Sequence, residues 1–582
     1  MEDIKMDNSN KKSRKKAKNP ERKKAAGSLI IVILAVVILA AVGIGAFLIN
    51  KYSESSTMRD AYEYFGVTKG SDEILVYVDG EKISTTAKNY DNEVYLPLSY
   101  VAANINARFY YDKESGKYLY TTGKGIYSFK TDDKEMTMDS GDKASFDYAL
   151  IKSVDGEAYI AWDYVCAYTD INSKFYESPD RLMIFTGHDE IEIVKASKKS
   201  AIRYRAGIKS DVLTYTQEGD LLTYGEEVDG WTKVTTESGF SGYIKNDALG
   251  EKTTYSYPVT FTETVTSIKL NDPVCIGWFQ VGGTAGNSAI SSTLDANNCI
   301  NVISPTWYSF TSTDGEMSCY ASESFVNEMH DEGMLVWPLI DDFDDSVDFA
   351  AMLSSQSTRK SIIEKLISDA KSYGYDGYNL DFENVTSKYA ADFLQFLREL
   401  SLECKANNII LSTDNYKPES YNSYYNLKDQ ACFVDYVVIM AYDEHYAGSD
   451  AGSVASISFV KECVENTKEL VPADKIVLGM PFYTRIWTVN NGNTTSRAVA
   501  MQTAITENSS NGGIAIWDDS LGQYFSSYET SAGTVSIWFE EDKSIGEKMK
   551  VYQESGIAGV ACWKLGLEKA SVWTVINRYL NS

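Results

Sequence analysis

The stretch DGYNLDFE, residues 376–383, alternates polar side chains with large apolar ones. Successive side chains of a β-strand point to opposite faces, so Asn379, Asp381 and Glu383 share one face and the apolar side chains between them share the other. An apolar face of this kind packs against helices in an α/β domain. The pattern therefore predicts a strand that turns two carboxyl groups and an amide away from its helices.

Strand-like apolar runs alternate with amphipathic helices on both sides of this stretch, from about Val259 to the end of the chain. Eight such runs in about 320 residues predict a (β/α)8 barrel, whose active sites lie at the C-terminal ends of the strands. Glu383 would then lie nearest the mouth of the barrel. The runs are Val274–Gln280, Cys299–Ser304, Met334–Ile340, Tyr375–Glu383, Ile409–Asp414, Val434–Tyr442, Lys475–Phe482 and Ile557–Trp563.

Two of the intervening helices can be placed from their apolar periodicity. Residues 358–373 put four aliphatic side chains on one face and stop at Gly374, and Lys388–Cys404 repeats the pattern. The stretch 490–545 is longer than an ordinary strand-to-helix connection. We expect it to form an inserted β lobe.

Two acids inside a barrel are costly to keep ionised. Each buried ion gives up about several kcal/mol of hydration free energy, which is offset only if the ion is paired or if the two acids share a proton. The charge of Asp381 and partial desolvation should raise the pKa of Glu383, which suits a general acid near neutral pH. The alternative, a solvated acidic edge, does not explain the regular alternation with bulky apolar residues.

The motif D-G-x-N-x-D-x-E resembles the D-x-x-D-x-D-x-E signature of glycoside hydrolase family 18, the chitinases and related N-acetylglucosaminidases. The likeness covers roughly 320 residues and is closest to the spore cortex-lytic and peptidoglycan N-acetylglucosaminidase branch, through LDFENV, MAYDEH, GMPFYTRIW and SIWFEE. One position departs, because the middle Asp of the signature is Asn379. We expect this change to alter the pH dependence and to leave activity in place.

The resemblance implies a role for each motif residue. Glu383 would donate a proton to the glycosidic oxygen, and Asp381 would orient the 2-acetamido group whose carbonyl oxygen attacks the anomeric carbon. Tyr442 would hydrogen-bond that acetamido oxygen, and Asp443 would bind sugar. The residues alone leave open a direct carboxylate nucleophile, and a Tyr442 that merely caps its strand.

Trp563 matches the aromatic floor under the reacting sugar, since an indole face stacks on the apolar face of a pyranose. A packing role for this Trp is the alternative. The further residues predicted to bind substrate are Asp376, Asn379, Trp307, Tyr483 and Arg485.

Metal and cofactor chemistry has no visible motif in the sequence. The three His are far apart, no C-x-x-C occurs, and most of the eight Cys read as small buried thiols. The acidic run 341–345 lacks the spacing of a calcium loop, so a solvated loop is the favoured interpretation over a cation site. We expect neither a cofactor nor a metal.

The N-terminal region predicts a membrane anchor. Residues 1–26 hold ten Lys/Arg against four acids, and residues 27–50 form an uncharged apolar run long enough to span a bilayer. The basic tail should stay cytoplasmic, which places the rest of the chain outside. A cleaved signal peptide is the main alternative and a buried core helix a lesser one. With a net charge of −27, nucleic acid is not an expected partner.

Two small β-rich domains are predicted between this anchor and the barrel domain of residues 259–582, after a linker at 51–71. Residues 72–190 resemble the N-terminal domain of copper amine oxidases through xVDGxxI and LPLSYVAxxINA, without implying copper chemistry. They contain a weak repeat, 94–112 and 158–178, of the kind that builds paired structural units.

Residues 195–252 resemble bacterial SH3 domains, with short alternating strands and Gly turns around GWTKV and GYI. Trp231 is either a ligand contact or a core residue. Both small domains suit contact with a cell wall.

The sequence as a whole predicts a membrane-anchored, outward-facing enzyme that hydrolyses β-1,4 bonds at N-acetylglucosamine in peptidoglycan or chitin-like glycans. A catalytically inactive glycan-binding protein and an envelope scaffold built on the two small domains are the alternatives.

Overall fold

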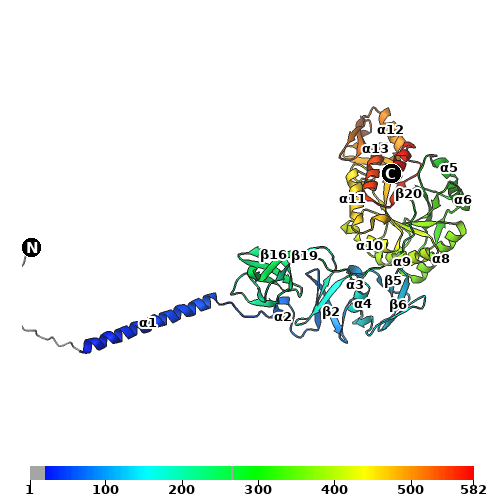
Figure 1. Ribbon diagram of the computed structural model, residues 1–582. Helices are drawn as coiled ribbons and strands as arrows, with labels where there is room; N and C mark the ends of the chain where they lie inside the picture. Colours follow the sequence, from blue (N-terminus) through cyan, green and yellow to red (C-terminus); the bar gives the residue numbers. More distant parts are fainter. Residues whose placement is uncertain (1–19, 264–265, 582) are drawn as a thin grey trace, which may run out of the picture. The chain divides into compact units, whose positions relative to one another are not determined.

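The computed structural model describes residues 20–263 and 266–581, with side chains from residue 29 onward. The chain forms two compact units, each built from two separate segments (Figure 1). The first unit comprises Met1–Thr86 and Asn172–Pro258, and the second comprises Ala87–Ile171 and Val259–Ser582. Residues 1–19 of the predicted basic tail lie outside the described residues.

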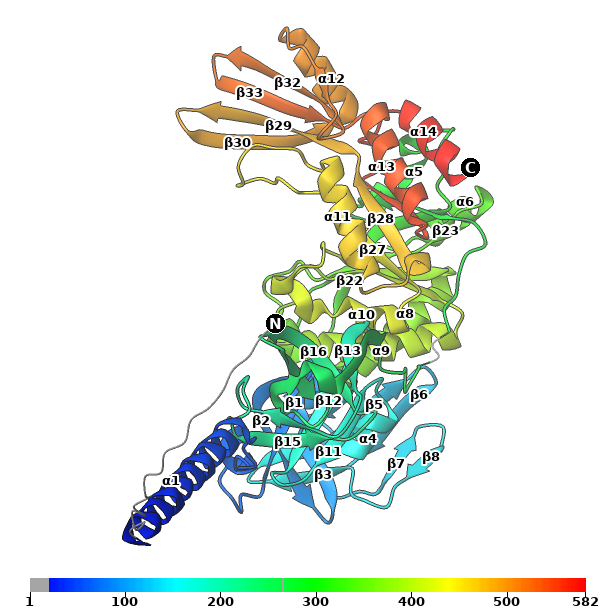
Figure 2. The ribbon, with the colours of Figure 1, turned by 60° about the vertical axis from the view of Figure 1, so that its left-hand side comes forward.

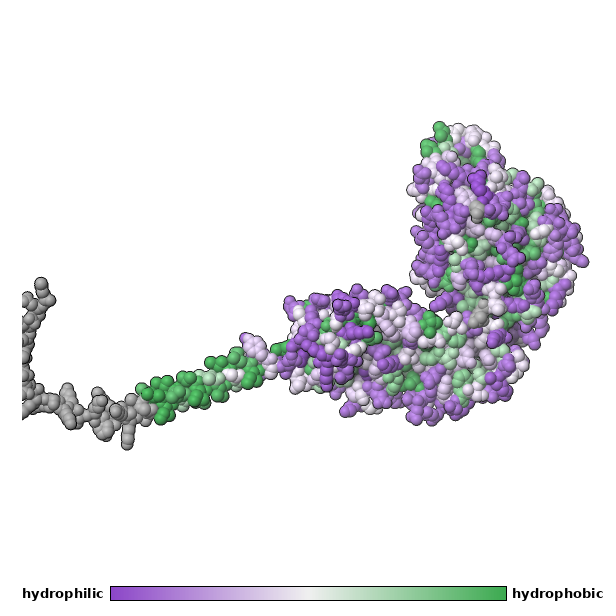
Figure 3. Space-filling view, in the orientation of Figure 1, coloured by the Kyte–Doolittle hydropathy of each residue, from purple (hydrophilic) through white to green (hydrophobic). Residues whose placement is uncertain are grey.

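The predicted anchor is a continuous helix, α1, over Pro20–Tyr52. Its segment Leu29–Tyr52 is long and apolar enough to cross a membrane, with a mean hydropathy of 3.2 and none of it buried in the protein. Figure 3 shows the segment Leu29–Tyr52 as an apolar rod. A signal sequence passes the same test of length and composition.

The rest of the first unit is rich in β-structure, as predicted. One sheet contains β11, β12 and β1, and a second, antiparallel sheet of seven strands has the order β15-β14-β18-β17-β16-β13-β19. The predicted linker is partly ordered, because its short helix α2 buries Phe65 in the core of this unit. The elements are α2 Ala61–Phe65, β1 Glu73–Val78, β11 Asn172–Tyr176, β12 Arg181–Phe185, β13 Ile191–Ala196, β14 Ser200–Arg203, β15 Val212–Thr216, β16 Leu221–Val228, β17 Trp231–Thr236, β18 Ser241–Lys245 and β19 Leu249–Tyr255.

The second unit begins with a small β-rich part, residues 87–171. The two copies of the weak repeat each give a strand followed by a short helix, and their strands β3 and β10 pair antiparallel. A five-stranded sheet has the order β4-β5-β6-β7-β8. The elements are β2 Glu81–Tyr90, which crosses the boundary between the units, β3 Glu93–Pro97, α3 Leu98–Asn104, β4 Phe109–Asp112, β5 Lys117–Thr122, β6 Gly125–Phe129, β7 Glu135–Met138, β8 Lys143–Ser145, β9 Ile151–Val154, β10 Glu157–Ala161 and α4 Trp162–Ala167.

The remainder of the second unit is the predicted parallel barrel. Its strands follow the order β20-β34-β28-β27-β26-β25-β24-β21, and β21 pairs with β20 to close the ring. The strands are β20 Val274–Phe279, β21 Val302–Phe310, β23 Leu335–Val336 with β24 Leu339–Asp341, β25 Gly377–Asp381, β26 Ile410–Asn415, β27 Tyr436–Met440, β28 Ile476–Pro481 and β34 Gly559–Trp563; β22 Met317–Cys319 pairs with β21 from outside the ring.

Helices surround the ring and cover its outer face (Figure 1). The predicted helix at 358–373 is α8, which ends at Gly374 in a left-handed conformation, and the next predicted helix is α9. The helices are α5 Ile290–Thr293, α6 Glu323–Asp331, α7 Phe349–Ser354, α8 Gln356–Tyr373, α9 Ala390–Ala406, α10 Leu427–Phe433, α11 Ile457–Lys468, α13 Asp542–Ser555 and α14 Ser571–Leu580.

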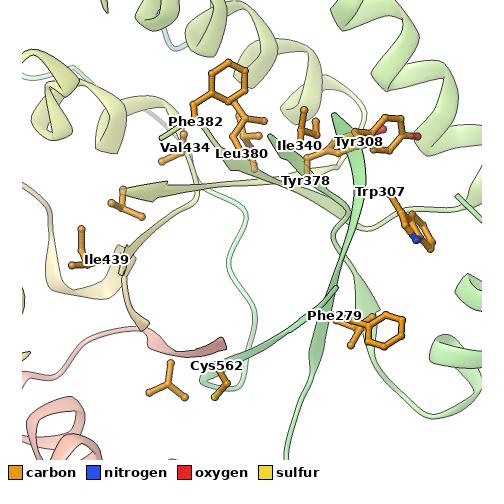
Figure 4. Packing of buried hydrophobic residues seen from close by; sticks show 14 of the residues in the cluster. Phe279, Trp307, Tyr308, Ile340, Tyr378, Leu380, Phe382, Val434, Ile439 and Cys562 are labelled. Carbon is orange, nitrogen blue, oxygen red and sulfur yellow. The ribbon is translucent and has the colours of Figure 1, made fainter. Parts of the chain in front are cut away.

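The strand alternation of β25 is confirmed in three dimensions. Tyr378, Leu380 and Phe382 belong to the apolar layer between the ring and its helices (Figure 4), and the Tyr378 hydroxyl donates to the carbonyl of Leu366 on α8. A second cluster, which includes Trp278 and Val438, fills the inside of the ring. Asn379 and Asp381 therefore point inward.

The predicted β lobe lies between β28 and α13. Figure 2 shows its sheet with α12 packed beside it. The order is β30-β29-β33-β32-β31, with antiparallel pairing. Its elements are β29 Tyr483–Asn490, β30 Asn493–Ala500, α12 Met501–Ser510, β31 Ile516–Asp518, β32 Gln523–Thr530 and β33 Gly533–Phe539.

Buried ion pairs join residues 87–171 to the barrel helices within the second unit. Arg359 of α8 is 0% exposed and contacts Glu399 of α9 at 2.8 Å and Asp112 of β4 at 3.2 Å. Arg108 contacts Asp429 of α10 at 3.1 Å. Charges this deeply buried are tolerated only when they are paired, so the network fixes this small β-rich part to the barrel.

Candidate active site

The predicted catalytic residues lie at the C-terminal ends of β25 and β27, the two strands that flank β26 in the ring. Asp381 is the last residue of β25, Glu383 lies two residues beyond it, and Tyr442 lies two residues beyond the end of β27. This is the end at which (β/α)8 barrels place their reactive groups. Burial raises the pKa of the Tyr442 phenol well above its ordinary range, and the charges of Asp381, Asp414 and Glu383 raise it further.

Asn379 lies below these residues as a hydrogen-bonding hub inside the ring. Its amide oxygen accepts from Trp278 Nε1 at 2.8 Å and Ser304 Oγ at 3.2 Å. Its amide nitrogen donates to Ser412 Oγ at 3.0 Å and Asp414 Oδ1 at 2.8 Å. The side chain is 0% exposed, so it supports the site from beneath and does not reach substrate, contrary to the prediction that it binds sugar.

Asp381 is 5% exposed, and its Oδ1 is buried without a hydrogen-bond partner in the described part of the chain. Burial and the nearby charges of Asp414, Glu383 and Asp342 raise its pKa well above the ordinary range. A buried carboxylate with a free oxygen is costly to keep. The geometry leaves this oxygen available to a donor that is not part of the protein, or to a shared proton.

Glu383 is half-buried beside the mouth of the ring. Its Oε2 accepts a hydrogen bond from the phenol of Tyr416, which follows β26. Burial raises the pKa of Glu383, and Asp443 and Asp341 raise it further, while the Tyr416 hydrogen bond acts in the opposite direction. The net shift of the Glu383 pKa is upward, which is the direction that suits a general acid.

The backbone at Glu383 is fixed by Asp342, which follows β24. Asp342 accepts hydrogen bonds from the N–H groups of Glu383 and Asn384, both at 2.9 Å. Burial raises the pKa of Asp342 to about 7. The acidic run 341–345 is therefore not simply a solvated loop, because Asp342 is almost fully buried and anchors the segment that carries Glu383.

Three other predicted residues form a second group at the same end of the barrel. The phenol of Tyr483 donates to Asp443 Oδ1, and Arg485 Nη2 lies 3.8 Å from the same oxygen. Arg485 also keeps a buried Nε without a partner among the described residues. The group brings an anion, a cation and a phenol together where β27 and β28 end.

Trp563 ends β34 and is partly buried. Its ring packs edge-on against Trp278, with centroids 5.9 Å apart and planes at 68°. Trp278 itself donates to Asn379. Trp563 therefore lies above the hub inside the ring, consistent with the predicted aromatic floor.

Two predicted residues lie away from the site. Trp307 is 0% exposed, packs against Phe325 of α6 outside the ring and donates to Asn287 Oδ1. Asp376 precedes β25 at the opposite end of the barrel, where it contacts His330 Nε2 at 2.8 Å. Neither can contact a substrate at the C-terminal ends of the strands, so both predictions are wrong.

Three residues of the site were not predicted as such from the sequence: Asp342, Asp414 and Tyr416. Asp414 carries the clearest signal. In LSTDN of β26, Ser412 and Asp414 are two residues apart and therefore share one face of the strand, as Asn379 and Asp381 do in β25. The contacts of Asp342 and Tyr416 come from loops, where the sequence has no periodicity to place a side chain.

Comparison with known proteins gives a matching family and several relatives. The family model for glycosyl hydrolases family 18 matches residues 274–568, half of the chain. The glycosylase YvbX of Bacillus subtilis is 25% identical over 312 residues, which cover 51% of this chain and 90% of YvbX. The cortical fragment-lytic enzyme of the same organism is 27% identical, over 40% of this chain and 56% of its own length.

A plant protein and a solved structure are also similar to this chain. The class V chitinase of Arabidopsis thaliana is 26% identical, over 39% of this chain and 67% of its own length. The crystal structure of the Bacillus cereus spore cortex-lytic enzyme SleL has a TM-score of 0.49 and 22% identity, covering 56% of this chain and 78% of that one. All of these similarities cover only part of this chain.

Proposed function

Because this chain belongs to glycosyl hydrolase family 18 and is a glycosidase, we propose that it cleaves β-1,4 bonds at N-acetylglucosamine in peptidoglycan or chitin-like glycans. We propose further that the substrate's own acetamido group is the nucleophile. The observation that carries the proposal is the pair of inward-turned acids at one mouth of the barrel, Glu383 with a raised pKa and Asp381 with an unpartnered oxygen.

In the first step, Glu383 donates its proton to the glycosidic oxygen as the bond from that oxygen to the anomeric carbon breaks. The acetamido carbonyl oxygen forms a bond to the same carbon, giving an oxazolinium ion. Asp381 accepts a hydrogen bond from the acetamido N–H through its free oxygen, and Tyr442 donates to the acetamido oxygen. The negative charge of Asp381 offsets the positive charge that develops on the ring.

In the second step, ionised Glu383 takes a proton from water as that water attacks the anomeric carbon. The bond to the acetamido oxygen breaks, and the sugar leaves with its original anomeric configuration. Glu383 recovers its proton, so the enzyme returns to its starting state. Asp443 and Arg485 suit hydroxyl groups of a neighbouring sugar, and Trp563 suits the apolar face of the reacting sugar.

The proposed location is the outer face of a cell membrane. The apolar helix supports this, together with the basic residues that precede it in the sequence. We propose that the two small β-rich domains, 72–190 and 195–252, contact the glycan network. Their resemblance to envelope modules supports this role.

Glu383→Gln tests the proposed activity on the full chain in detergent, with N-acetylglucosamine oligomers and purified peptidoglycan as substrates. We expect turnover to fall by about 1,000-fold or more while the affinity for oligomers stays within about threefold. Glu465→Gln, an exposed Glu on α11, is the matched control and should keep full activity. A wild-type chain that binds oligomers without cleaving them would instead be a glycan-binding protein.

The nucleophile is tested separately with oligomers that lack the acetyl group. The proposal predicts no cleavage of de-acetylated oligomers, and release of acetylated products that first appear with the β-configuration. Equal cleavage of both substrates would identify a protein carboxylate as the nucleophile.

A further inference from the structure

Asp414 is a buried acid that the proposed mechanism does not use. It is 4% exposed, and its Oδ1 accepts the 2.8 Å hydrogen bond from the amide of Asn379. An amide can donate such a bond, whereas an ionised Asp at position 379 could not. The residue that departs from the family signature is thus the one that holds Asp414 in place.

The strand register puts Asp414 beside Asp381. Strands β25 and β26 are parallel, with Asn379 opposite Ser412 and Leu380 opposite Thr413. One residue further along, Asp381 lies opposite Asp414, and neighbouring strands are about 4.8 Å apart. Both side chains turn to the inside of the ring, because Asn379 reaches Ser412 and Asp414 there.

Two adjacent buried carboxyl groups cannot both be ionised at low cost, so they share one proton. The unpartnered Oδ1 of Asp381 is the atom that such a proton would satisfy. The pKa values of both acids are consistent with a shared proton, because burial and neighbouring carboxylates raise them well above the ordinary range. The titratable groups that interact with the pair are Asp341, Asp342, Glu383, Tyr416 and Tyr442.

We propose that Asp414 is a positioning residue of this glycosidase, which shares one proton with Asp381 and replaces, from the neighbouring strand, the carboxyl group that the family signature places at position 379. This inference rests on the proposed function. The pair holds one proton and a net charge of −1 throughout. As the acetamido N–H binds Asp381, the proton lies on Asp414, and it returns to the shared position when product leaves.

The test is the pH profile of kcat/KM for the full chain in detergent on N-acetylglucosamine oligomers. Asp414→Asn removes the carboxyl group that shares the proton, so this site can no longer reach a charge of −2 as the pH rises, and the pKa of both Asp381 and Glu383 falls. We therefore expect the alkaline limb to move to lower pH by about one unit or more, and kcat/KM at pH 7 to fall about tenfold or more. The double variant Asn379→Asp with Asp414→Asn returns a carboxyl group to β25, and should recover most of the activity and the position of the limb.

Asp435→Asn is the matched control. Asp435 is a fully buried acid near the opposite end of the barrel, where it accepts from the N–H groups of Leu411 and Ile268. Its loss should reduce stability and leave both limbs in place. A purely structural Asp414 would behave in the same way.

If the wild-type enzyme is active and Asp414→Asn has the same alkaline limb, the pairing is overturned and the proposed activity stands. Loss of the proposed activity is recognised separately, by a wild-type chain that does not cleave the oligomers. If Asp414→Asn gives no folded protein, Asn379→Asp decides the question. A third carboxyl group there should move the alkaline limb to higher pH, and an unmoved limb would overturn the proposal.

Discussion

Asp342 Oδ1 lies 2.9 Å from the backbone nitrogen of Glu383, so an acid at the end of one strand holds the backbone of the acid at the end of the next. The same carboxyl group accepts the N–H of Asn384. Two hydrogen bonds to consecutive backbone groups restrict the position of the Glu383 carboxyl group before any substrate binds. A proton donor placed in advance loses less entropy in the transition state.

Asp342→Ala should therefore impair catalysis more than binding. We expect kcat on N-acetylglucosamine oligomers to fall about 10- to 100-fold, with KM changed by less than about threefold. Asp344→Ala is the control, because Asp344 is partly buried and its carboxyl group accepts hydrogen bonds only from Ser346 among the described residues. Equal kcat values in the two variants would show that the Asp342 contact does not position Glu383.

Tyr416→Phe should shift the pH profile upward. The phenol of Tyr416 donates to Glu383 and stabilises its ionised form, so its hydrogen bond lowers the pKa of that acid. Without it, the pKa of Glu383 rises further and the general acid keeps its proton to higher pH. We expect the alkaline limb of kcat/KM to move up by about half a unit to one unit, opposite to the shift expected for Asp414→Asn. A downward shift would contradict this assignment.

The barrel and the inward face of β25 could be predicted because both depend on short-range patterns. The alternation over 376–383 fixes which side chains face the helices, and the eight apolar runs fix the number of strands. The hydrogen-bond partners that other strands supply could not be predicted from these short-range patterns. The bonds of Asn379 come from β20, β21 and β26, which meet only after the ring closes.

The misplacement of Trp307 and Asp376 has physical causes. A bulge between Thr306 and Tyr308 shifts the register of β21, and Trp307 lies in this irregular stretch and turns toward α6. Asp376 belongs to the motif, but it precedes the first paired residue of β25, so its place is the end of the barrel away from Glu383. Counting residues within a motif does not by itself give the end of the strand.

The membrane proposal predicts that an acidic pair in the apolar helix releases the protein. Val36→Asp with Val37→Asp places two charges near the middle of the span, each costing about 2.5–3.5 kcal/mol in a bilayer. We expect the wild-type chain to stay with membranes after alkaline extraction and the double variant to be found in the soluble fraction. Val36→Leu with Val37→Leu is the control and should remain bound. A wild-type chain that is extracted like a soluble protein would contradict the anchor.

The buried ion pairs of Arg359 predict a large difference between two neighbouring positions on α8. Arg359→Met leaves Asp112 and Glu399 without their cation in a buried setting, which should cost about 3–5 kcal/mol. Lys360 is exposed and lies 3.8 Å from Glu364, so Lys360→Met should change stability by less than about 0.5 kcal/mol.

Urea unfolding of the full chain, followed by tryptophan fluorescence, measures this difference. The barrel contains buried tryptophans such as Trp337 and Trp573, so its unfolding gives the signal. We expect a clearly lower midpoint for Arg359→Met and an unchanged one for Lys360→Met. Matching midpoints would mean that residues 87–171 are held to the barrel by apolar contacts, since the charges would then contribute nothing to stability. A lower midpoint with normal turnover of folded protein would separate this interface from the active site.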